Sequence, residues 1–232
     1  MKEIIKTIIE FIYDPELLPL NKNNAANYIT LAGVWLSRLS LYMFMMILVW
    51  FFAFDTIPYT LRYIAIGMAI LASGLDALDG IVARKFNCVT ELGKIFDPHH
   101  DKNQYNCKTI SILIDSILFA FLAINTTGET FFPHYIFLSL LVIYFTHERD
   151  EAIMFHRLWA QTEKTNVNLQ AKWSGKWRTR ICFGGFPLLH LLIYPGQHII
   201  FFYLVAFLMI GITLISNYQY VKEYRQVIKN NQ

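Results

Sequence analysis

The sequence predicts an all-α integral membrane protein with six transmembrane helices and an N-terminal interfacial amphipathic helix. Of its 232 residues, 55% are hydrophobic and only 16% are charged, whereas soluble domains contain about 25% charged residues. The apolar residues occur in long blocks, and alternate connections between these blocks contain no lysine or arginine. These patterns indicate a chain that crosses a membrane several times.

The first 25 residues form an amphipathic segment. Their isoleucines follow a helical repeat and make one apolar stripe, at Ile4, Ile5, Ile8, Ile9 and Ile12. A helix of this kind lies in the membrane interface with its charged side toward water. We therefore expect residues 1–25 to lie on the inner leaflet, residues 26–220 to form a six-helix bundle, and the chain 1–232 to be a single domain.

Six apolar blocks follow, and each is expected to form the centre of one transmembrane helix. They are Leu41–Phe54, Tyr59–Leu75, Ile110–Ile124, Phe131–Phe145, Ile181–Tyr194 and Ile199–Ile215. A crossing needs about 20 residues, so polar flanking residues must extend the shorter blocks.

The loop charges predict the orientation. The connections around Asp55, Glu129 and Gly196 contain no lysine or arginine, whereas the other loops and both terminal segments do. Lys108 is counted among the cations of the loop after the second block. Because positive residues stay on the cytoplasmic side, both termini and the two long loops are expected there. The net charge of +3 fits anionic membrane lipid, and no nucleic-acid partner is expected.

Four aspartates stand out, two directly after the second block and two at the predicted start of the third helical stretch, where Pro98 fits the first turn. Asp76 and Asp79 are three residues apart, and Asp97 and Asp101 are four apart, so each pair shares one face of a helix. Four carboxylates close together stay ionised only beside cations. Hard divalent ions prefer oxygen ligands, so the spacing predicts a site for two Mg²⁺ or Mn²⁺ ions. Two such ions suit displacement at phosphorus.

The residues between the aspartates fit a phosphate-bearing ligand. Gly80 and Ala83 share the face of the first pair, and their small side chains let a nucleotide approach the backbone. Arg84 is a cation that can bind a phosphate at two points. Gly93, four residues before Asp97, leaves space on the facing helix.

At this point the sequence resembles the CDP-alcohol phosphotransferase family. From Asp76 to Asp101 it reads Asp-x-x-Asp-Gly-x-x-Ala-Arg, eight residues, then Gly-x-x-x-Asp-x-x-x-Asp, which matches the family signature at every defined position. The resemblance implies a six-helix membrane fold. It also implies that an alcohol attacks the β-phosphorus of a CDP-linked donor and that CMP leaves.

The resemblance further assigns roles to residues. Asp76, Asp79 and Asp97 would ligate the metals, and Asp101 would ligate one metal and act as the general base. The CDP moiety would lie against Gly80, Ala83, Arg84 and Gly93, and an Asn-x-x-Thr element adds Asn27 and Thr30. The active site would face the cytoplasm, in a bacterial inner membrane.

A downstream loop bears on the acceptor. It resembles the loop of phosphatidylglycerophosphate synthases, because Arg149 and Arg157 are eight residues apart and a Gly-Lys-x-Arg element follows, with Lys176 and Arg178. These four cations suit an acceptor that carries a phosphate. The favoured substrates are therefore CDP-diacylglycerol and a small polar alcohol, glycerol 3-phosphate. Positive residues with no substrate contact are the alternative.

Other assignments stay open at this level. Gly33 stands where phosphatidyl-transferring synthases often have arginine, and His99 and His100 stand where small or apolar residues are usual. The acceptor alternatives are inositol phosphate, serine and choline, and a CDP-choline or CDP-ethanolamine donor with diacylglycerol acceptor is a further one. A channel or transporter would need charges within several spans, and the apolar blocks are taken to be free of them. A homodimer is possible.

Overall fold

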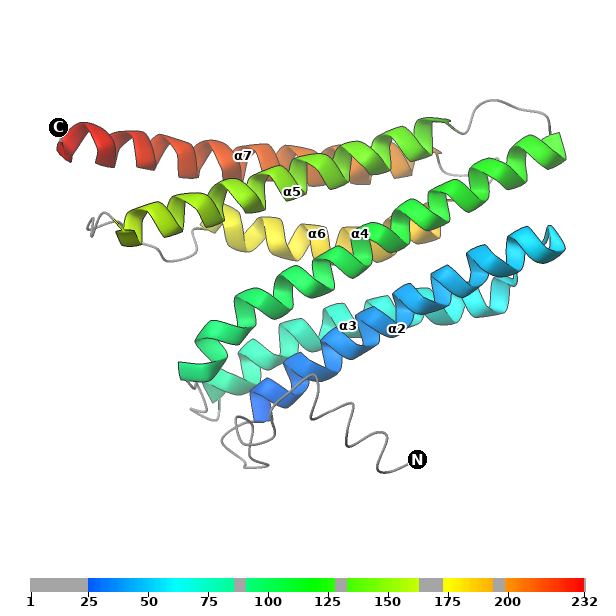
Figure 1. Ribbon diagram of the computed structural model, residues 1–232, viewed down its shortest axis with the longest axis horizontal. Helices are drawn as coiled ribbons and strands as arrows, with labels where there is room; N and C mark the ends of the chain where they lie inside the picture. The colour runs from blue at the N-terminus through cyan, green and yellow to red at the C-terminus, as the bar shows by residue number, and fades with distance from the viewer. Residues whose placement is uncertain (1–24, 86–90, 128–132, 163–172, 194–198, 232) are drawn as a thin grey trace.

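In the computed structural model of this chain, six long α-helices contain nearly all of the residues that the structure describes (Figure 1). They are α2 (Ala25–Phe54), α3 (Tyr59–Lys85), α4 (Glu91–Thr127), α5 (Pro133–Thr162), α6 (Trp173–Leu192) and α7 (Ile199–Asn231). The structure describes residues 25–85, 91–127, 133–162, 173–193 and 199–231, with some helical side chains left out. The predicted interfacial segment, residues 1–25, thus lies outside the described residues except for Ala25.

Each predicted apolar block lies mainly within one of these helices, so the all-helical fold class is confirmed. Four helices are long and apolar enough to cross a membrane, over Ala26–Phe54, Tyr59–Ala83, His100–Asn125 and Ile200–Lys222. Helices α5 and α6 do not meet that standard among the described residues. The chain is a multi-pass helical membrane protein, and the full count of six crossings is taken up below as a proposal.

A tight turn makes α2 and α3 antiparallel neighbours. Asp55 ends α2 in the left-handed region, with a φ of 55°, a conformation that aspartate tolerates better than most residues. Its N–H donates to the carbonyl of Phe51 at 2.7 Å. Pro58 stands just before α3, and its carbonyl accepts from the N–H of Arg62 at 3.1 Å, so the next helix starts at once.

Helix α4 is the centre of the bundle. It crosses between the α2–α3 pair and the layer of α5, α6 and α7 (Figure 1), and 67% of its most apolar window is buried, more than in any other candidate span. Its 37 residues extend about 55 Å, which exceeds the bilayer core of about 30 Å. One end of α4 therefore projects beyond the membrane.

The start of α4 differs from the sequence prediction, which placed Pro98 in the first turn. The helix begins at Glu91, so Pro98 lies inside it. Proline lacks an N–H and removes one helical hydrogen bond, but the turns on either side continue the helix. As a result, Gly93, Asp97 and Asp101 all lie on one continuous helix.

The outer surface is apolar, as lipid contact requires. Val49 of α2 is 70% exposed and Ile200 of α7 is 69% exposed, while Phe44, Ile112 and Phe186 are fully buried between the helices. Only one side of each outer helix is therefore used for packing, and the other is left for hydrocarbon.

The two ends of the bundle differ in composition. At one end, the amide of Asn125 in α4 donates to Asp55 at 3.2 Å. At the other end lie the predicted site residues of α2, α3, α4, α5 and α6, joined by the contacts described next. This difference between the two ends agrees with the charge pattern of the loops, because the predicted site residues lie at the helix ends that the positive loops connect.

Candidate active site

Two helices bring carboxylates together at the charged end of the bundle. Asp76 and Asp79 lie one turn apart on α3, both half-buried, and Asp101 lies on α4. A side-chain hydrogen bond joins Asp76 to Asp101. The two helix faces that the aspartate spacing predicted therefore do meet, at this pair.

Three further predicted residues have described backbones only. Arg84 lies on α3, and Gly93 and Asp97 lie on α4, one turn apart. Among the side chains that the structure describes, no group of three or more His, Cys, Asp or Glu is arranged to hold a metal. The Asp97 side chain does not belong to that described set. The donor chemistry nevertheless fits Mg²⁺ or Mn²⁺, because touching carboxylates repel each other when ionised and hard cations bind oxygen.

The start of α2 supports one of these carboxylates. The hydroxyl of Thr30 is buried and lies 2.5 Å from Oδ2 of Asp79 and 3.1 Å from the carbonyl oxygen of Ala26. Its single proton can be donated to either oxygen. Asn27 lies one turn earlier on the same helix, half-buried. Gly80 and Ala83, also half-buried, follow Asp79 on α3, so these five residues lie on two adjoining helices.

The glycine at position 33 has a packing reason. A Cβ atom there would lie 3.0 Å from Nε2 of Gln104 on α4 and 3.4 Å from the carbonyl oxygen of Ala72 on α3. Helices α2, α3 and α4 approach one another closely at this point. An arginine would have to displace the Gln104 side chain, so this departure from the synthase pattern reflects helix packing.

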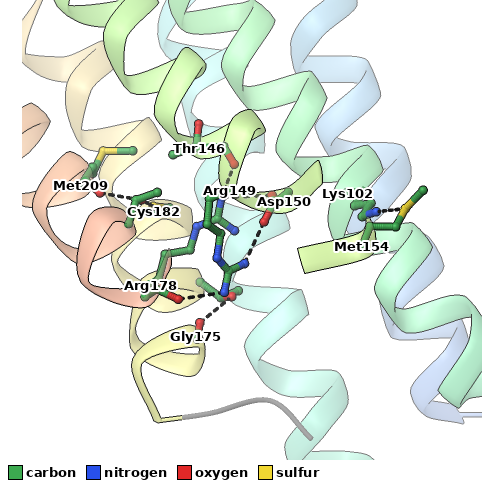
Figure 2. A network of polar contacts seen from close by, with 12 residues as sticks. Lys102, Thr146, Arg149, Asp150, Met154, Gly175, Arg178, Cys182 and Met209 are labelled. Atoms are coloured by element: carbon green, nitrogen blue, oxygen red, sulfur yellow. Dashed lines mark hydrogen bonds and ion pairs between the residues drawn. The ribbon is translucent and has the colours of Figure 1, made fainter. Parts of the chain in front are cut away.

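A second cluster contains two of the four predicted acceptor cations. Arg149 of α5 and Arg178 of α6 are buried, and both bind the carboxylate of Asp150, at 2.8 Å and 3.0 Å (Figure 2). Lys176 is exposed and has no ion pair in the part of the chain that the structure describes. Arg157 lies on α5, and its side chain is outside the described set.

Tyr105 connects the two clusters through α4. It follows Asp101 by one helical turn, and its buried ring lies 4.7 Å from Cζ of Arg178. The arginine pair and the aspartates therefore border neighbouring turns of one helix. An anionic group bound by the arginines would lie close to the carboxylates.

The arrangement agrees with a match to a known family. Residues 23–216, well over half of the chain, match the model of the family described as CDP-alcohol phosphatidyltransferase. The chain belongs to the CDP-alcohol phosphatidyltransferase family.

Curated relatives of this family are similar over shorter segments. A protein named CDP-diacylglycerol--glycerol-3-phosphate 3-phosphatidyltransferase from Mycoplasma genitalium is 36% identical over 104 residues, 45% of this chain and 35% of the relative. Proteins of the same name from Rickettsia felis and Rickettsia typhi are 37% identical over 90 residues and 52% identical over 44 residues. The Rickettsia felis segment covers 39% of this chain and 44% of the relative, and the Rickettsia typhi segment covers 19% of this chain and 25% of the relative. The chain thus spans less than half of each relative that it matches.

Lys108 lies close to the signature aspartates of the CDP-alcohol phosphatidyltransferase family. Sequence reasoning misplaced this residue, because it grouped Lys108 with the loop cations. It is 2% exposed within α4, and its ammonium donates to the hydroxyl of Ser73 at 2.9 Å and lies 3.7 Å from the centre of the Phe183 ring. Its charge also interacts with Asp76 and Asp101. Lys108 follows Asp101 by two helical turns, a spacing that could have revealed it.

Sequence reasoning was also wrong in taking the spans of this member of the CDP-alcohol phosphatidyltransferase family to be free of charge. Arg62 of α3, Asp115 of α4 and His190 of α6 form a fully buried cluster, with Asp115 bound to both partners at 2.8 Å. The cluster is internally paired, because Arg62 also donates to the carbonyls of His190 and Ile193. A hydropathy average hides such residues, since two charges change the mean of a long block only slightly.

Proposed function

We propose that this protein transfers the phosphatidyl group of CDP-diacylglycerol to glycerol 3-phosphate and releases CMP. The observation that carries the proposal is the proximity of two clusters of opposite charge: carboxylates that suit metal ions, and a buried arginine pair one turn further along α4. The relatives named for this reaction support the choice of donor and acceptor.

Asp101 is proposed as the general base. The acceptor hydroxyl gives its proton to the Asp101 carboxylate as its oxygen forms a bond to the β-phosphorus of the donor. The bond from that phosphorus to the bridging oxygen breaks, and its electron pair leaves with CMP. A positioned base commonly contributes about 10²–10⁴-fold to such a step.

Two divalent ions, Mg²⁺ or Mn²⁺, are proposed to be held by Asp76, Asp79, Asp97 and Asp101. When bound, they would stabilise negative charge on the attacking and leaving oxygens. Thr30 would hold Asp79 in orientation through the 2.5 Å contact. The remaining signature residues and the Asn-x-x-Thr element are proposed to bind the CDP moiety. These residues are Gly80, Ala83, Arg84 and Gly93 of the signature, and Asn27 and Thr30 of the element.

The acceptor phosphate is proposed to bind the cationic residues Arg149, Arg157, Lys176 and Arg178. Arginine binds phosphate at two points with charge-assisted hydrogen bonds. Arg149 and Arg178 are the strongest candidates, because both are buried and both bind Asp150. Cζ of Arg178 also lies 4.7 Å from the centre of the Tyr105 ring of α4. Asp150 alone cannot neutralise both arginines, so an unphosphorylated alcohol would leave a positive charge of the pair uncompensated, which disfavours it as acceptor.

The proposed topology has six crossings, with both termini and the active site on the cytoplasmic side of a bacterial inner membrane. Helix α6, with 20 residues, is about 30 Å long, which equals the thickness of the bilayer core. The positive loops support this orientation. An interfacial helix within residues 1–25 and a homodimer belong to the same proposal.

The test is an activity measurement with the purified protein in detergent or liposomes. CDP-diacylglycerol is supplied with Mg²⁺ or Mn²⁺ and, separately, glycerol 3-phosphate, inositol phosphate, serine or choline, and CMP release and the lipid product are measured. The proposal expects phosphatidylglycerophosphate with glycerol 3-phosphate. CMP release with another alcohol but not with glycerol 3-phosphate would overturn it, and a parallel assay of CDP-choline or CDP-ethanolamine with diacylglycerol tests the exchanged donor.

A further inference from the structure

Asp150 lies between two buried arginines that come from different helices. Its Oδ1 accepts from Nη1 of Arg149 at 2.8 Å, and its Oδ2 accepts from Nη2 of Arg178 at 3.0 Å. Figure 2 shows Arg149, Arg178 and Asp150 close together, with Arg178 coming from α6 and the other two from α5. One carboxylate therefore fixes both side chains, and each of its oxygens binds one of them.

Other contacts complete the position of each guanidinium. Nη2 of Arg149 donates to the hydroxyl of Ser216 at 2.9 Å, and its Cζ lies 5.4 Å from the ring centre of Tyr220. Nη2 of Arg178 also donates to the carbonyl of Thr146 at 3.1 Å. The Nε atoms of both arginines are buried and have no hydrogen-bond partner among the described residues. Each arginine thus has one N–H donor that no described group accepts.

The charges of the cluster do not cancel. The side chains of Arg149, Arg178 and Asp150 are only 10%, 5% and 20% exposed, so two positive charges meet one negative charge away from bulk water. Burial and the neighbouring charge of Arg178 lower the pKa of Arg149, and the contact with Asp150 opposes this shift. An added anion would supply the missing negative charge.

Gly175, in the first turn of α6, keeps this cluster compact. A Cβ atom at Gly175 would lie 3.2 Å from Nη2 of Arg149 and 3.2 Å from the hydroxyl of Tyr220. Those contacts are closer than side chains usually make, so a larger residue would push the guanidinium away. The chain therefore leaves room for one arrangement of Arg149.

We propose that Asp150 is a positioning residue that holds Arg149 and Arg178 together as one phosphate-binding pair for the acceptor. This inference rests on the proposed function, since it assigns the pair to the acceptor phosphate. The opposite arrangement is that Asp150 competes with phosphate for the same N–H groups. The two arrangements predict opposite changes in the KM for the acceptor when the carboxylate is removed.

The test compares Asp150→Asn with the matched control Glu151→Gln. Glu151 is the adjacent residue and is exposed, so the control removes an equal charge outside the cluster. Initial rates are measured against glycerol 3-phosphate at saturating CDP-diacylglycerol. Asp150→Asn should raise the acceptor KM about tenfold or more with a smaller change in kcat, and Asp150→Glu should recover part of the loss. Glu151→Gln should match wild type. An unchanged or lowered KM in Asp150→Asn would overturn the proposal.

A binding measurement separates this inference from the proposed reaction. Inorganic phosphate is titrated into the wild-type protein and Asp150→Asn, and the apparent melting temperature is followed. Stabilisation of wild type that Asp150→Asn largely loses supports the inference even if glycerol 3-phosphate is not the acceptor. Equal stabilisation of the two proteins overturns it even if the reaction is correct. If Asp150→Asn does not fold, Asp150→Glu is compared with Glu151→Gln, and an unchanged phosphate response and KM overturn the proposal.

Discussion

Arg62 and Asp115 form a two-point ion pair in the interior of the bundle. Nε and Nη2 of Arg62 each donate to a different carboxylate oxygen of Asp115 at 2.8 Å, and both side chains are at most 2% exposed. The Arg62 guanidinium also lies 4.6 Å from the ring centre of Phe119. This pair ties α3 to α4 far along both helices from the aspartates of the signature.

Removing one partner of this pair should destabilise the protein strongly. Asp115→Asn would leave the Arg62 charge buried without compensation, which costs about 3–5 kcal/mol for buried pairs. We expect a clear decrease in the apparent melting temperature of the purified protein in detergent, measured by tryptophan fluorescence. Folded protein should still catalyse the reaction, because the pair lies away from the carboxylates.

The double variant Arg62→Met with Asp115→Asn is the control for this prediction. It removes both charges and keeps an acceptor for Nδ1 of His190, which lies 2.8 Å from Asp115. It should therefore melt above the more damaged of the two single variants. Destabilisation equal to the sum of the two single effects would show that the two charges are not coupled.

Thr30→Val should weaken metal use. The substitution keeps the side-chain shape and removes the hydroxyl that lies 2.5 Å from Asp79. Loss of a partner that orients a metal ligand typically costs about 10–100-fold in metal affinity or activity. We expect the Mn²⁺ or Mg²⁺ concentration for half-maximal activity to rise about tenfold, measured by CMP release during a metal titration.

Two further variants control this result. Thr30→Ser keeps the hydroxyl and should stay near wild type. Thr213→Val removes a buried hydroxyl of α7 that donates to the Met209 carbonyl one turn earlier at 2.7 Å and makes a weak hydrogen bond with the Cys182 sulfur at 4.0 Å, away from the aspartates. It should not change the metal requirement. A similar shift in Thr213→Val would mean that general loosening of the bundle, not the Asp79 contact, causes the effect.

Asp101→Asn should stop the reaction without preventing donor binding. The amide cannot take the acceptor proton, so kcat should fall by about 10²–10⁴-fold. CMP release measures the loss, and retention of CDP-diacylglycerol on the immobilised variant measures binding. Turnover at the wild-type rate would exclude Asp101 as the base.

A chelator should likewise abolish wild-type CMP release, with recovery on adding Mg²⁺ or Mn²⁺.

The local parts of this structure could be predicted from the sequence. Residues three or four apart on a helix share a face regardless of the rest of the fold, and this explains why the spacing of Asp76, Asp79 and Asp101 indicated helix faces that meet. The apolar blocks predicted the helices for a similar reason, because hydropathy averages over many residues. The predicted beginning of α4 was wrong by seven residues. Pro98 was taken as the start of the helix, whereas Glu91 is the first helical residue.

Contacts between distant helices could not be predicted. Arg178 and Asp150 are 28 residues apart, and Arg62 and Asp115 are 53 apart, so spacing carries no information on whether they touch. Lys108 was missed because a charge count cannot tell a lysine in a loop from one near the middle of a long helix. Buried polar pairs of this type depend on how the helices cross, which only the three-dimensional structure shows.

Gly185 and Gly184 give a matched test of the packing between α6 and α7. A Cβ atom at Gly185 would lie 2.6 Å from Sδ and 3.0 Å from Cγ of Met209, whereas nothing lies within 4 Å of one at Gly184. Gly185→Ala should therefore destabilise by about 1–3 kcal/mol, and Gly184→Ala should be neutral or stabilising by up to about 1 kcal/mol, because alanine favours helix. Thermal unfolding measures both. The double variant Gly185→Ala with Met209→Ala should lose less unfolding free energy than the sum of the losses in the two single variants. A loss equal to that sum would mean that the clash with Met209 is not the cause.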